Sequence, residues 1–306
     1  MNAGIRASVR SALAGGLSVY GVKRGYQGLI DDDIVPMSST DVSNILQRGG
    51  TILHSARSEE FRTAQGRKKA SANLKKRNID GLIVFGGDGS FRGAKDLQDE
   101  HNIKVVGAPA TIDNDIWGTD FTIGFDTAVN TALEAVDKVR DTAAAHDRLF
   151  IIEVMGRHAG FIALEVGIGT GAEDIFIPET KSDIPSICNK ILRRSRNGRT
   201  SSILVVAEGD EEGNAYEIAE KIKIHSGIKS RVTVLGHIQR GGSPTASDRM
   251  LATKLGYGAV QALINNNAPC MVGIQNSKIT HHSLTDSSTH KKKLDQVLIK
   301  LISELE

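Results

Sequence analysis

Several residue types are scarce in this 306-residue chain, and each shortage excludes a class of protein. Two cysteines, Cys188 and Cys270, are too few and too far apart in sequence for a disulfide framework or a cysteine-rich metal site. We therefore expect both to be buried thiols in a reducing compartment. Aromatic residues make up only 4% of the chain, whereas 32 glycines are present. This combination suits an α/β fold with tight strand-to-helix turns better than a β-sandwich.

Excess charge and long apolar runs are also missing. The formal net charge is only +2, which argues against nucleic acid as a partner, although a few arginines can still meet an anionic substrate. The sequence has no run of 18 apolar residues and no signal peptide, so we expect a cytoplasmic protein without a membrane partner. With 40% hydrophobic and 24% charged residues, the composition is that of a globular enzyme, and its length favours two lobes.

Apolar runs of strand length alternate with longer helical patterns along the chain. The alternation predicts a doubly wound α/β architecture with mostly parallel sheets in two lobes, residues 1–123 and 124–306. A C-terminal segment that crosses back to the first lobe is compatible with this division. The expected strands cover residues 17–22, 81–85, 104–108, 149–154, 174–177, 202–207, 232–236 and 271–275. The expected helices include residues 125–146 and a last helix over 288–306 with Leu294, Val297, Leu298, Leu301 and Ile302 on one side.

A glycine-rich turn, residues 86–90 (GGDGS), follows the expected strand 81–85. Glycines allow close backbone approach, and the N–H groups at a helix start form an anion site for phosphates. Asp88 is suited to hold Mg²⁺, since that ion prefers oxygen ligands together with nucleotide phosphates. The alternative is a strand-terminating turn with Asp88 as the helix N-cap, because short Gly-Gly-Asp turns are common.

Two carboxylates, Asp113 and Asp115, lie two residues apart in the segment 109–115 (PATIDND), directly after the expected strand 104–108. Such a pair is costly to bury unpaired and is therefore poor core material. In phosphoryl transfer one carboxylate can accept the proton of an attacking hydroxyl, while the other orients the acceptor or helps to hold the metal. The alternative is an acidic loop in solvent with Asn-Asp turn chemistry.

Polar side chains follow further strands. Arg157, in the segment 153–160 (EVMGRHAG), would point from a helix start toward developing phosphoryl charge, and a surface ion pair is the alternative. Glu208 ends the expected strand 202–207 and is suited to sugar hydroxyls.

A last basic group surrounds one strand and its loop. Arg231, His237 and Arg240 together can grip a phosphate monoester, although each taken singly is more often a solvated surface residue.

Together these segments resemble the phosphofructokinase family. GGDGS, TIDNDIWGTDFTIGFDTA, IIEVMGRHAG and RVTVLGHIQRGGSPT stand in the family order across nearly the whole chain. One such motif gives modest support for membership of the family, but four long motifs in the family order give strong support. The resemblance implies an ATP-dependent 6-phosphofructokinase that uses Mg²⁺ and transfers the γ-phosphoryl group of ATP to the C1 hydroxyl of fructose 6-phosphate in glycolysis.

The resemblance also assigns roles residue by residue. The implied catalytic residues are Asp113 as general base, Thr111 beside it, and Arg157 and Arg57 on the transferring phosphoryl group. The implied nucleotide contacts are Arg57, Gly87, Asp88, Gly89, Ser90 and Gly93, with Asp88 also holding Mg²⁺. The implied sugar-phosphate contacts are Thr111, Asp113, Asp115, Arg148, Met155, Gly156, Arg157, Glu208, Arg231, His237 and Arg240. In the family Arg148 and Arg231 reach the site from a neighbouring subunit, which implies a homotetramer with shared active sites.

The resemblance further concerns regulation by ADP or phosphoenolpyruvate, which bacterial members bind at a subunit interface. The residues that match this effector pattern are Arg6, Arg10, Arg140, Glu173 and Arg199. Ser39 and Asn197, however, stand where arginine and lysine are common, and Asn44 where aspartate is common. Each lost charged hydrogen bond is worth about 1.5–3 kcal/mol, so we expect a weak or absent response.

Two positions indicate the phosphoryl donor. Pyrophosphate-using relatives usually carry Asp at the position of Gly89 and Lys at that of Ala110, so this chain favours ATP. Trp117 stands where proline is usual, and the alternatives are a tolerated loop substitution or an altered sugar contact or loop stiffness.

The largest departure is at the start of the chain. Family members open with a β-strand and a Gly-Gly-Asp-x-Pro-Gly loop ahead of the position of Met1. We therefore expect unpaired sheet neighbours, exposed apolar surface and a nucleotide site without that loop. The two hypotheses are a start assigned at an internal methionine and a truncated form.

Three functional hypotheses follow. The leading one is the ATP-dependent phosphofructokinase, with a pyrophosphate-dependent enzyme as its variant. The second is a lipid or NAD kinase with a related turn, against which residues 111–115 and 231–240 argue. The third is a catalytically impaired or non-catalytic chain, which the missing first strand supports.

Overall fold

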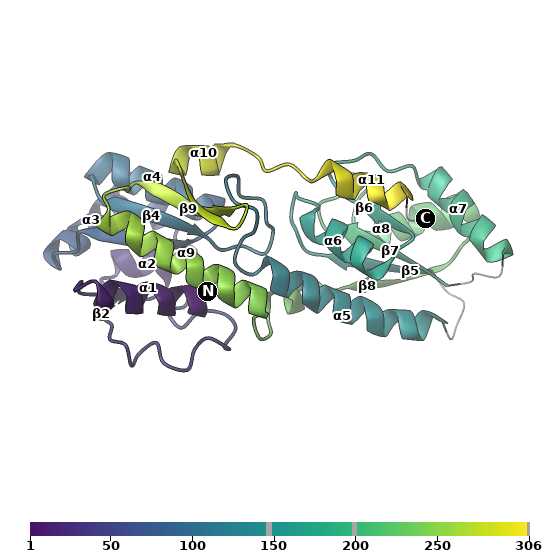
Figure 1. Cartoon of the computed structure of the whole chain (residues 1–306). Coiled ribbons are helices and arrows are strands. Elements are labelled where there is room, and N and C mark those ends of the chain that lie inside the picture. Colours follow the sequence, from purple (N-terminus) through teal and green to yellow (C-terminus); the bar gives the residue numbers. More distant parts are fainter. Residues whose placement is uncertain (145–148, 198–200, 305–306) are drawn as a thin grey trace. The chain divides into compact units, whose positions relative to one another are not determined.

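The computed structural model describes residues 1–144, 149–197 and 201–304. The chain forms two compact units, each assembled from separate stretches of sequence (Figure 1). Unit 1 comprises Met1–Thr111, Ile116–Gly124 and Ser243–Lys292. Unit 2 comprises Ile112–Asp115, Phe125–Gly242 and Lys293–Glu306. No helix in the described part of the chain is long and apolar enough to cross a membrane.

Unit 1 is built on a four-stranded sheet of order β10-β9-β4-β3. The strands β3, β4 and β9 are parallel, whereas β10 adds to β9 as an antiparallel neighbour. Among the described strands β3 pairs with β4 alone, and its apolar residues 82–85 remain partly exposed, as expected for an unpaired sheet edge. The strands are β3 (Gly81–Gly86), β4 (Lys104–Pro109), β9 (Cys270–Gln275) and β10 (Lys278–His282), and a separate two-stranded ribbon pairs β1 (Tyr20–Val22) with β2 (Ile34–Pro36).

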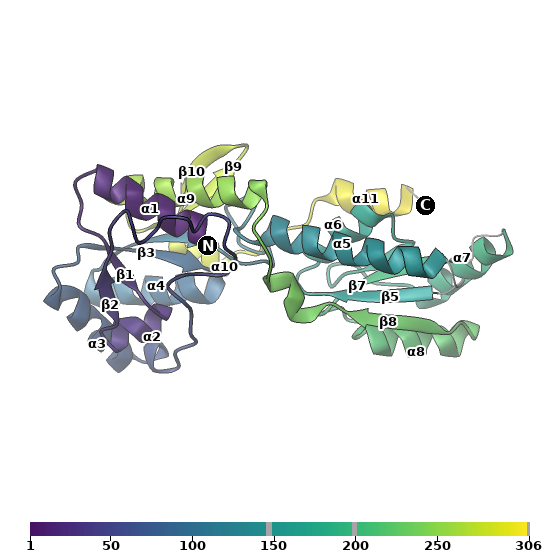
Figure 2. The same ribbon diagram turned by 90° about the horizontal axis from the view of Figure 1, so that it is seen from below.

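Alternating side chains of this sheet enter two different cores. Ile83, Val106 and Val272 pack under α9, whereas Leu82 and Val105 pack toward α4. Figure 2 shows α1 and α9 together on one side of the sheet and α4 on the other. The helices of unit 1 are α1 (Asn2–Ala14), α2 (Gly25–Ile30), the 3-10 helix η1 (Glu60–Arg62), α3 (Ala64–Lys76), α4 (Asp88–His101), α9 (Ala246–Ile264) and α10 (Leu284–Thr289).

Unit 2 contains a fully parallel sheet of order β6-β7-β5-β8. Its central strand β7 is buried along its whole length, which accounts for its continuously apolar sequence. The strands are β5 (Leu149–Val154), β6 (Asp174–Phe176), β7 (Ser202–Ala207) and β8 (Ser230–Val234).

In this sheet too, successive side chains along each strand point to opposite faces. Ile152 and Val205 pack with α5 and α6, whereas Ile151 and Leu204 pack with α7 and α8. The helices of unit 2 are α5 (Phe125–Ala144), α6 (Phe161–Thr170), α7 (Ile184–Arg196), α8 (Ala215–Ser226), the 3-10 helix η2 (Gly236–Arg240) and α11 (Gln296–Glu304). The predicted α/β class with mostly parallel sheets is thereby confirmed.

Most expected strands lie within one residue of their expected limits, but three predictions are wrong by more than that. Residues 17–19 precede β1 and are not in a strand, and β8 begins two residues before the expected 232. The expected helix over 288–306 is instead two helices, α10 and α11, because residues 290–295 run between them without helical structure. Val297 is 65% exposed, so it does not belong to the packed side that Leu294 and Leu298 share.

The division into units also differs from the expected lobes of residues 1–123 and 124–306. The chain does pass from one unit to the other after Gly124, but Ser243–Lys292 belongs to unit 1. The reason is strand pairing, because β9 hydrogen-bonds to β4 and α9 packs against α1. The last residues, from Lys293 on, belong to unit 2.

Candidate active site

The glycine-rich turn of unit 1 joins β3 directly to α4. Gly87 is the N-cap of α4 in extended conformation and makes no side-chain capping bond. Asp88 is therefore the first helical residue, and the alternative in which it caps the helix is wrong. A Cβ at Gly87 would contact Thr111 at 3.6 Å, whereas a Cβ at Gly89 would meet nothing within 4 Å. The turn thus leaves open space at Gly89, beside a helix start suited to phosphate.

Asp88 is held by a side chain of its own helix. The Nε and Nη2 atoms of Arg92, one turn further along α4, both donate to its carboxylate, the former at 2.9 Å to Oδ1. The Asp88 side chain is still 39% exposed. Within the described ranges, no group of three or more His, Cys, Asp or Glu side chains is arranged so that it could hold a metal ion. A site with one carboxylate fits Mg²⁺, which keeps several waters and takes further oxygens from nucleotide phosphates.

The other nucleotide-related residues of unit 1 lie near an aromatic stack. The rings of Tyr26 and Phe61 are parallel, with centroids 3.9 Å apart, and the Tyr26 hydroxyl donates to the carbonyl of Ser90 at 2.5 Å. Gly93 lies against both rings, since a Cβ there would be 3.0 Å from each. Arg57, upstream of Phe61, is exposed. Sequence reasoning found Ser90, Gly93 and Arg57 but missed the stacked pair, whose two members are 35 residues apart.

The acidic segment changes unit within its own length. Thr111 belongs to unit 1, where its carbonyl accepts a hydrogen bond from Thr122, whereas Ile112–Asp115 belongs to unit 2. Asp113 is only 4% exposed, so the alternative of an acidic loop in solvent is wrong for this residue. Asp115 is half-buried.

Arg157 provides a charge partner for the buried carboxylate. Its Nε atom lies 3.5 Å from Oδ2 of Asp113, while 61% of its own side chain is exposed. Arg157 has a left-handed backbone with φ of 54°, and the preceding Gly156 has φ of 149°. These uncommon conformations turn the chain sharply after β5 and place the arginine at the sheet end.

Three neighbours fix that turn. The backbone N–H of Arg157 donates to the Glu208 carboxylate at 2.9 Å, and the N–H of Met155 donates to Oε1 of Gln239 at 2.8 Å. A Cβ at Gly209 would lie 1.8 Å from the carbonyl oxygen of Arg157, so this position requires glycine. Glu208 was identified from sequence, whereas Gln239 and Gly209 were missed because nothing in their local sequence reveals a distant partner.

The remaining basic residues of unit 2 are exposed. Arg231 lies on β8, the sheet edge next to β5, and His237 and Arg240 lie on the 3-10 helix that follows it. Arg148 lies outside the described residues. The structure thus brings Met155, Gly156, Arg157 and Glu208 together around one turn and places the other candidates along the next strand.

The residues that match an effector pattern are divided between the units. Arg6 and Arg10 lie on α1 of unit 1, whereas Arg140 and Glu173 belong to unit 2, and Arg199 lies outside the described residues. Arg140 donates to the carbonyl of Thr170 at 2.6 Å, at the end of α6.

Glu173 borders a basic cavity of about 520 Å³. The Glu173 carboxylate lies 3.5 Å from Nη2 of Arg194. Lys190, Arg193 and Asn197 also line this cavity.

Known proteins resemble this chain along nearly its whole length. The chain is 54% identical over 301 residues to ATP-dependent 6-phosphofructokinase 1 of Thermus thermophilus, covering 98% of this chain and 94% of that protein. It is 52% identical over 305 residues to ATP-dependent 6-phosphofructokinase of Halalkalibacterium halodurans, covering 100% of this chain and 95% of that one.

Two solved structures share the fold. The phosphofructokinase from Saccharomyces cerevisiae superposes with a TM-score of 0.89 at 35% identity, over all of this chain and 45% of the yeast chain. Pyrophosphate-dependent phosphofructokinase from Marinobacter aquaeolei has a TM-score of 0.84 at 22% identity, over 99% of this chain and 87% of that one, and shows the fold alone. The family model for phosphofructokinase matches residues 1–263, and the chain belongs to that family.

Proposed function

We propose that this chain is an ATP-dependent 6-phosphofructokinase. It transfers the γ-phosphoryl group of MgATP to the C1 hydroxyl of fructose 6-phosphate and releases fructose 1,6-bisphosphate and ADP, a step of glycolysis. The observation that carries the proposal is the buried Asp113 carboxylate held 3.5 Å from Arg157, a contact between two family motifs. Curated relatives at 52–54% identity that bear this activity in their names support it.

The proposed roles follow from charge and position. Asp113 accepts the proton of the C1 hydroxyl, as a buried carboxylate with a cationic neighbour remains available as a base. Arg157 and Arg57 have exposed side chains and stabilise the negative charge of the transferring phosphoryl group. Thr111 and Asp115 orient the sugar beside Asp113. Asp88 holds Mg²⁺, and the ion neutralises phosphate charge when it is bound.

The donor side favours ATP over pyrophosphate. Gly87, Gly89, Ser90 and Gly93 contact the nucleotide, and the empty space at Gly89 leaves room for a phosphate chain that carries adenosine. An aspartate at Gly89, as in pyrophosphate-using relatives, would fill that space with negative charge.

The sugar phosphate is bound by residues of unit 2. Met155, Gly156 and Glu208 contact the sugar, and His237 and Arg240 contact its phosphate. Arg148 and Arg231 serve the site of a neighbouring subunit, in a homotetramer with shared active sites. The exposure of Arg231 on an edge strand supports this role, because an exposed arginine is available to a second chain.

Regulation by ADP or phosphoenolpyruvate is weak in this proposal. Arg6, Arg10, Arg140, Glu173 and Arg199 make up the effector set, but Ser39 and Asn197 supply no positive charge to it. We also propose a cytoplasmic location, as for a glycolytic enzyme.

The test is direct product analysis with the purified chain. Fructose 6-phosphate is incubated with Mg²⁺ and either ATP or pyrophosphate, and the sugar product is identified by ³¹P NMR. The expected result is fructose 1,6-bisphosphate with ATP and none with pyrophosphate, and product formation about 10²–10⁴-fold slower with Asp113→Asn. Turnover with pyrophosphate alone would overturn the donor assignment. An inactive chain that also fails to bind both substrates in calorimetry would overturn the function.

A further inference from the structure

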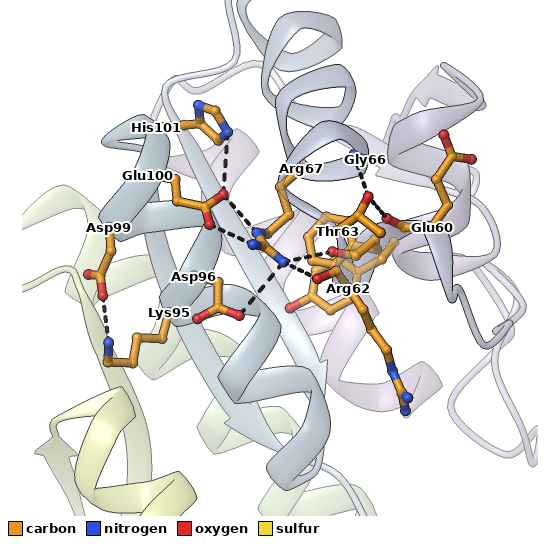
Figure 3. Close-up of polar contacts among 12 residues, drawn as sticks. Glu60, Arg62, Thr63, Gly66, Arg67, Lys95, Asp96, Asp99, Glu100 and His101 are labelled. Carbon is orange, nitrogen blue, oxygen red and sulfur yellow. Dashed lines mark hydrogen bonds and ion pairs between the residues drawn. The ribbon is translucent and has the colours of Figure 1, made fainter.

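A buried arginine of unit 1 joins the two helices α3 and α4. Arg67, on α3, is 8% exposed, and its Nε and Nη2 atoms donate to the two carboxylate oxygens of Glu100 on α4 at 2.8 and 2.5 Å. Asp96, one turn earlier on α4, lies 3.9 Å from Nη1 (Figure 3). The guanidinium pairs in a bidentate manner, and it holds the pKa of the Glu100 carboxyl below its usual range through this hydrogen bond.

The third nitrogen of the same guanidinium holds a different element. Nη1 of Arg67 donates to the carbonyl oxygens of Phe61 and Arg62 at 3.1 and 2.7 Å. These are the last two residues of η1, and Thr63 immediately afterwards caps α3. One planar group therefore fixes three elements at once, namely η1, α3 and α4.

The element η1 lies next to the candidate nucleotide site. The Phe61 ring stacks on Tyr26, whose hydroxyl donates to the carbonyl of Ser90 on the first turn of α4. On the other side, the N–H of Phe61 donates to Oγ of Ser58 at 3.2 Å, directly after Arg57. A shift of η1 would therefore move both the Arg57 segment and the contact to Ser90.

We propose that Arg67 is a positioning residue for the phosphoryl-donor site. It holds η1 on α4 and thereby keeps the Arg57–Ser58 segment and the Tyr26–Phe61 stack in place relative to Ser90. This inference rests on the proposed function. Arg67 does not contact substrate in this role, because its guanidinium is buried and makes four hydrogen bonds to Glu100 and the two carbonyls.

Lysine cannot replace this arginine. An ammonium group is a compact charge without the fork geometry, so it cannot reach a carboxylate on one helix and two carbonyls of another element together. Arg67→Lys keeps the charge opposite Glu100 and Asp96 but releases η1. The substitution thus tests the loss of the contacts to η1 while the positive charge at this position is kept.

The chain offers a matched control on the same helix. Arg77, the C-cap of α3, donates to Oδ1 of Asp32 at 2.6 Å and to the Asp32 carbonyl at 3.3 Å, and neither bond involves η1. Arg77→Lys therefore weakens an ion pair of an arginine with a single carboxylate oxygen at the opposite end of α3. Glu100→Gln is a second test variant, since it keeps the shape of the partner but removes its charge.

The experiment compares KM for ATP, KM for fructose 6-phosphate, kcat and melting temperature across these variants. We expect Arg67→Lys to raise KM for ATP about tenfold, since small misplacements of binding groups are costly, with KM for fructose 6-phosphate unchanged. Glu100→Gln should shift KM for ATP in the same direction by less. Arg77→Lys should lower the melting temperature and leave KM for ATP unchanged.

A second readout does not need turnover. Hydrogen exchange of residues 57–62, with and without a non-hydrolysable ATP analogue, should rise in Arg67→Lys and not in Arg77→Lys. Equal effects of the two lysine variants on KM for ATP and on this exchange would overturn the positioning role. If the unmodified chain binds the analogue but does not phosphorylate fructose 6-phosphate, the proposed function fails, and weaker analogue binding by Arg67→Lys still supports the positioning role.

Discussion

The Asp113 carboxylate lies 3.5 Å from the Arg157 guanidinium, yet only the aspartate is buried. The Asp113 side chain is 6% exposed and the Arg157 side chain 61%. The pair therefore combines a desolvated base with a cation whose remaining donors are available to a phosphate. In the proposed function these two contacting groups act on opposite ends of one reaction, so their substitutions should not be additive.

Replacing Asp113, the proposed base, should slow turnover strongly without preventing sugar binding. We expect Asp113→Asn to lower kcat by about 10²–10⁴-fold, the usual contribution of a general base, with a smaller change in KM for fructose 6-phosphate. Steady-state assays with a coupled ADP readout measure both constants.

The control for this substitution is Asp210→Asn in the same unit. Asp210 is 9% exposed, and burial raises the pKa of its carboxyl. It lies in the loop after Glu208, where its carboxylate accepts a hydrogen bond from the N–H of Glu212 at 2.8 Å. The amide oxygen of asparagine keeps this acceptor, so the control removes a desolvated charge while it preserves the loop. Its kcat should stay close to that of the unmodified chain. A comparable loss in both variants would show that the Asp113 effect is structural.

Gly209 controls the position of Arg157. An alanine Cβ would lie 1.8 Å from the Arg157 carbonyl oxygen, and this neighbour is backbone that cannot turn aside. Gly209→Ala should lower kcat by about 10²-fold, because a displacement of about 1 Å at a catalytic group has that cost. Gly169→Ala on α6 is the comparison, since its Cβ would meet only the flexible end of Leu133. Full activity of Gly209→Ala would contradict the close contact between Gly209 and the Arg157 carbonyl that we describe.

Gly89→Asp should affect stability and activity in opposite directions. Nothing lies within 4 Å of a Cβ at this position, and an acidic side chain in the first turn of a helix is favourable by about 0.3–1 kcal/mol. The same negative charge would repel the phosphates of ATP. We expect an unchanged or higher melting temperature together with a strongly raised KM for ATP. A lower melting temperature would mean that the site is less open than described.

If Asp88 holds Mg²⁺ as proposed, Arg92 should compete with the ion, since its guanidinium pairs with the same carboxylate. Exposed pairs at this helical spacing are worth about 0.3–0.5 kcal/mol, so Arg92→Gln should lower the Mg²⁺ concentration for half-maximal activity by about twofold. Asp88→Asn should raise that concentration far more. Magnesium titrations at fixed ATP distinguish the two variants, and identical shifts would exclude Asp88 as the ligand.

The stability of unit 1 should fall at acidic pH through His282. Burial first, and then the neighbouring His281, lower the pKa of this imidazole, while Asp286 opposes the shift. The folded state therefore binds a proton less readily than the unfolded state. As the pH falls below the ordinary histidine pKa of about 6.5, His282 should lower the free energy of unfolding. Trp117, the single tryptophan, packs edge-on against His282 and reports unfolding by fluorescence. In His282→Gln the pH dependence should be shallower.

Strongly patterned elements were predictable from sequence. Strands β5 and β7 were predicted to the residue because continuous burial gives them continuously apolar sequences. The turn at Asp88 and the segment around Asp113 were equally predictable from sequence. Glycines and carboxylates that cluster at the end of a strand seldom serve the packing of the fold and therefore indicate a binding or catalytic site.

Other features depend on contacts that the local sequence does not encode. Strand β10 was missed because its alternating residues are half-exposed and it is defined only by its partner β9. The C-terminal helix was predicted too long. The apolar residues from Leu294 to Ile302 have helical spacing, but residues 290–295, directly before α11, are not helical. Gln239 and Gly209 form the support of Arg157, yet each lies more than 50 residues from it in sequence. Trp117 was identified as unusual, but its histidine neighbours could not be foreseen.

The interrupted sequence of unit 1 has a consequence for synthesis on the ribosome. Strand β4 gains its neighbour β9, and α1 gains α9, only when residues 243–292 have emerged. Nearly all of unit 2 is translated before that point. The parallel sheet of unit 2 should therefore form first, while the earlier-made α1 and β4 still lack their partners and expose apolar faces. Stalled nascent chains that end before α9 should accordingly be bound by chaperones through their oldest residues.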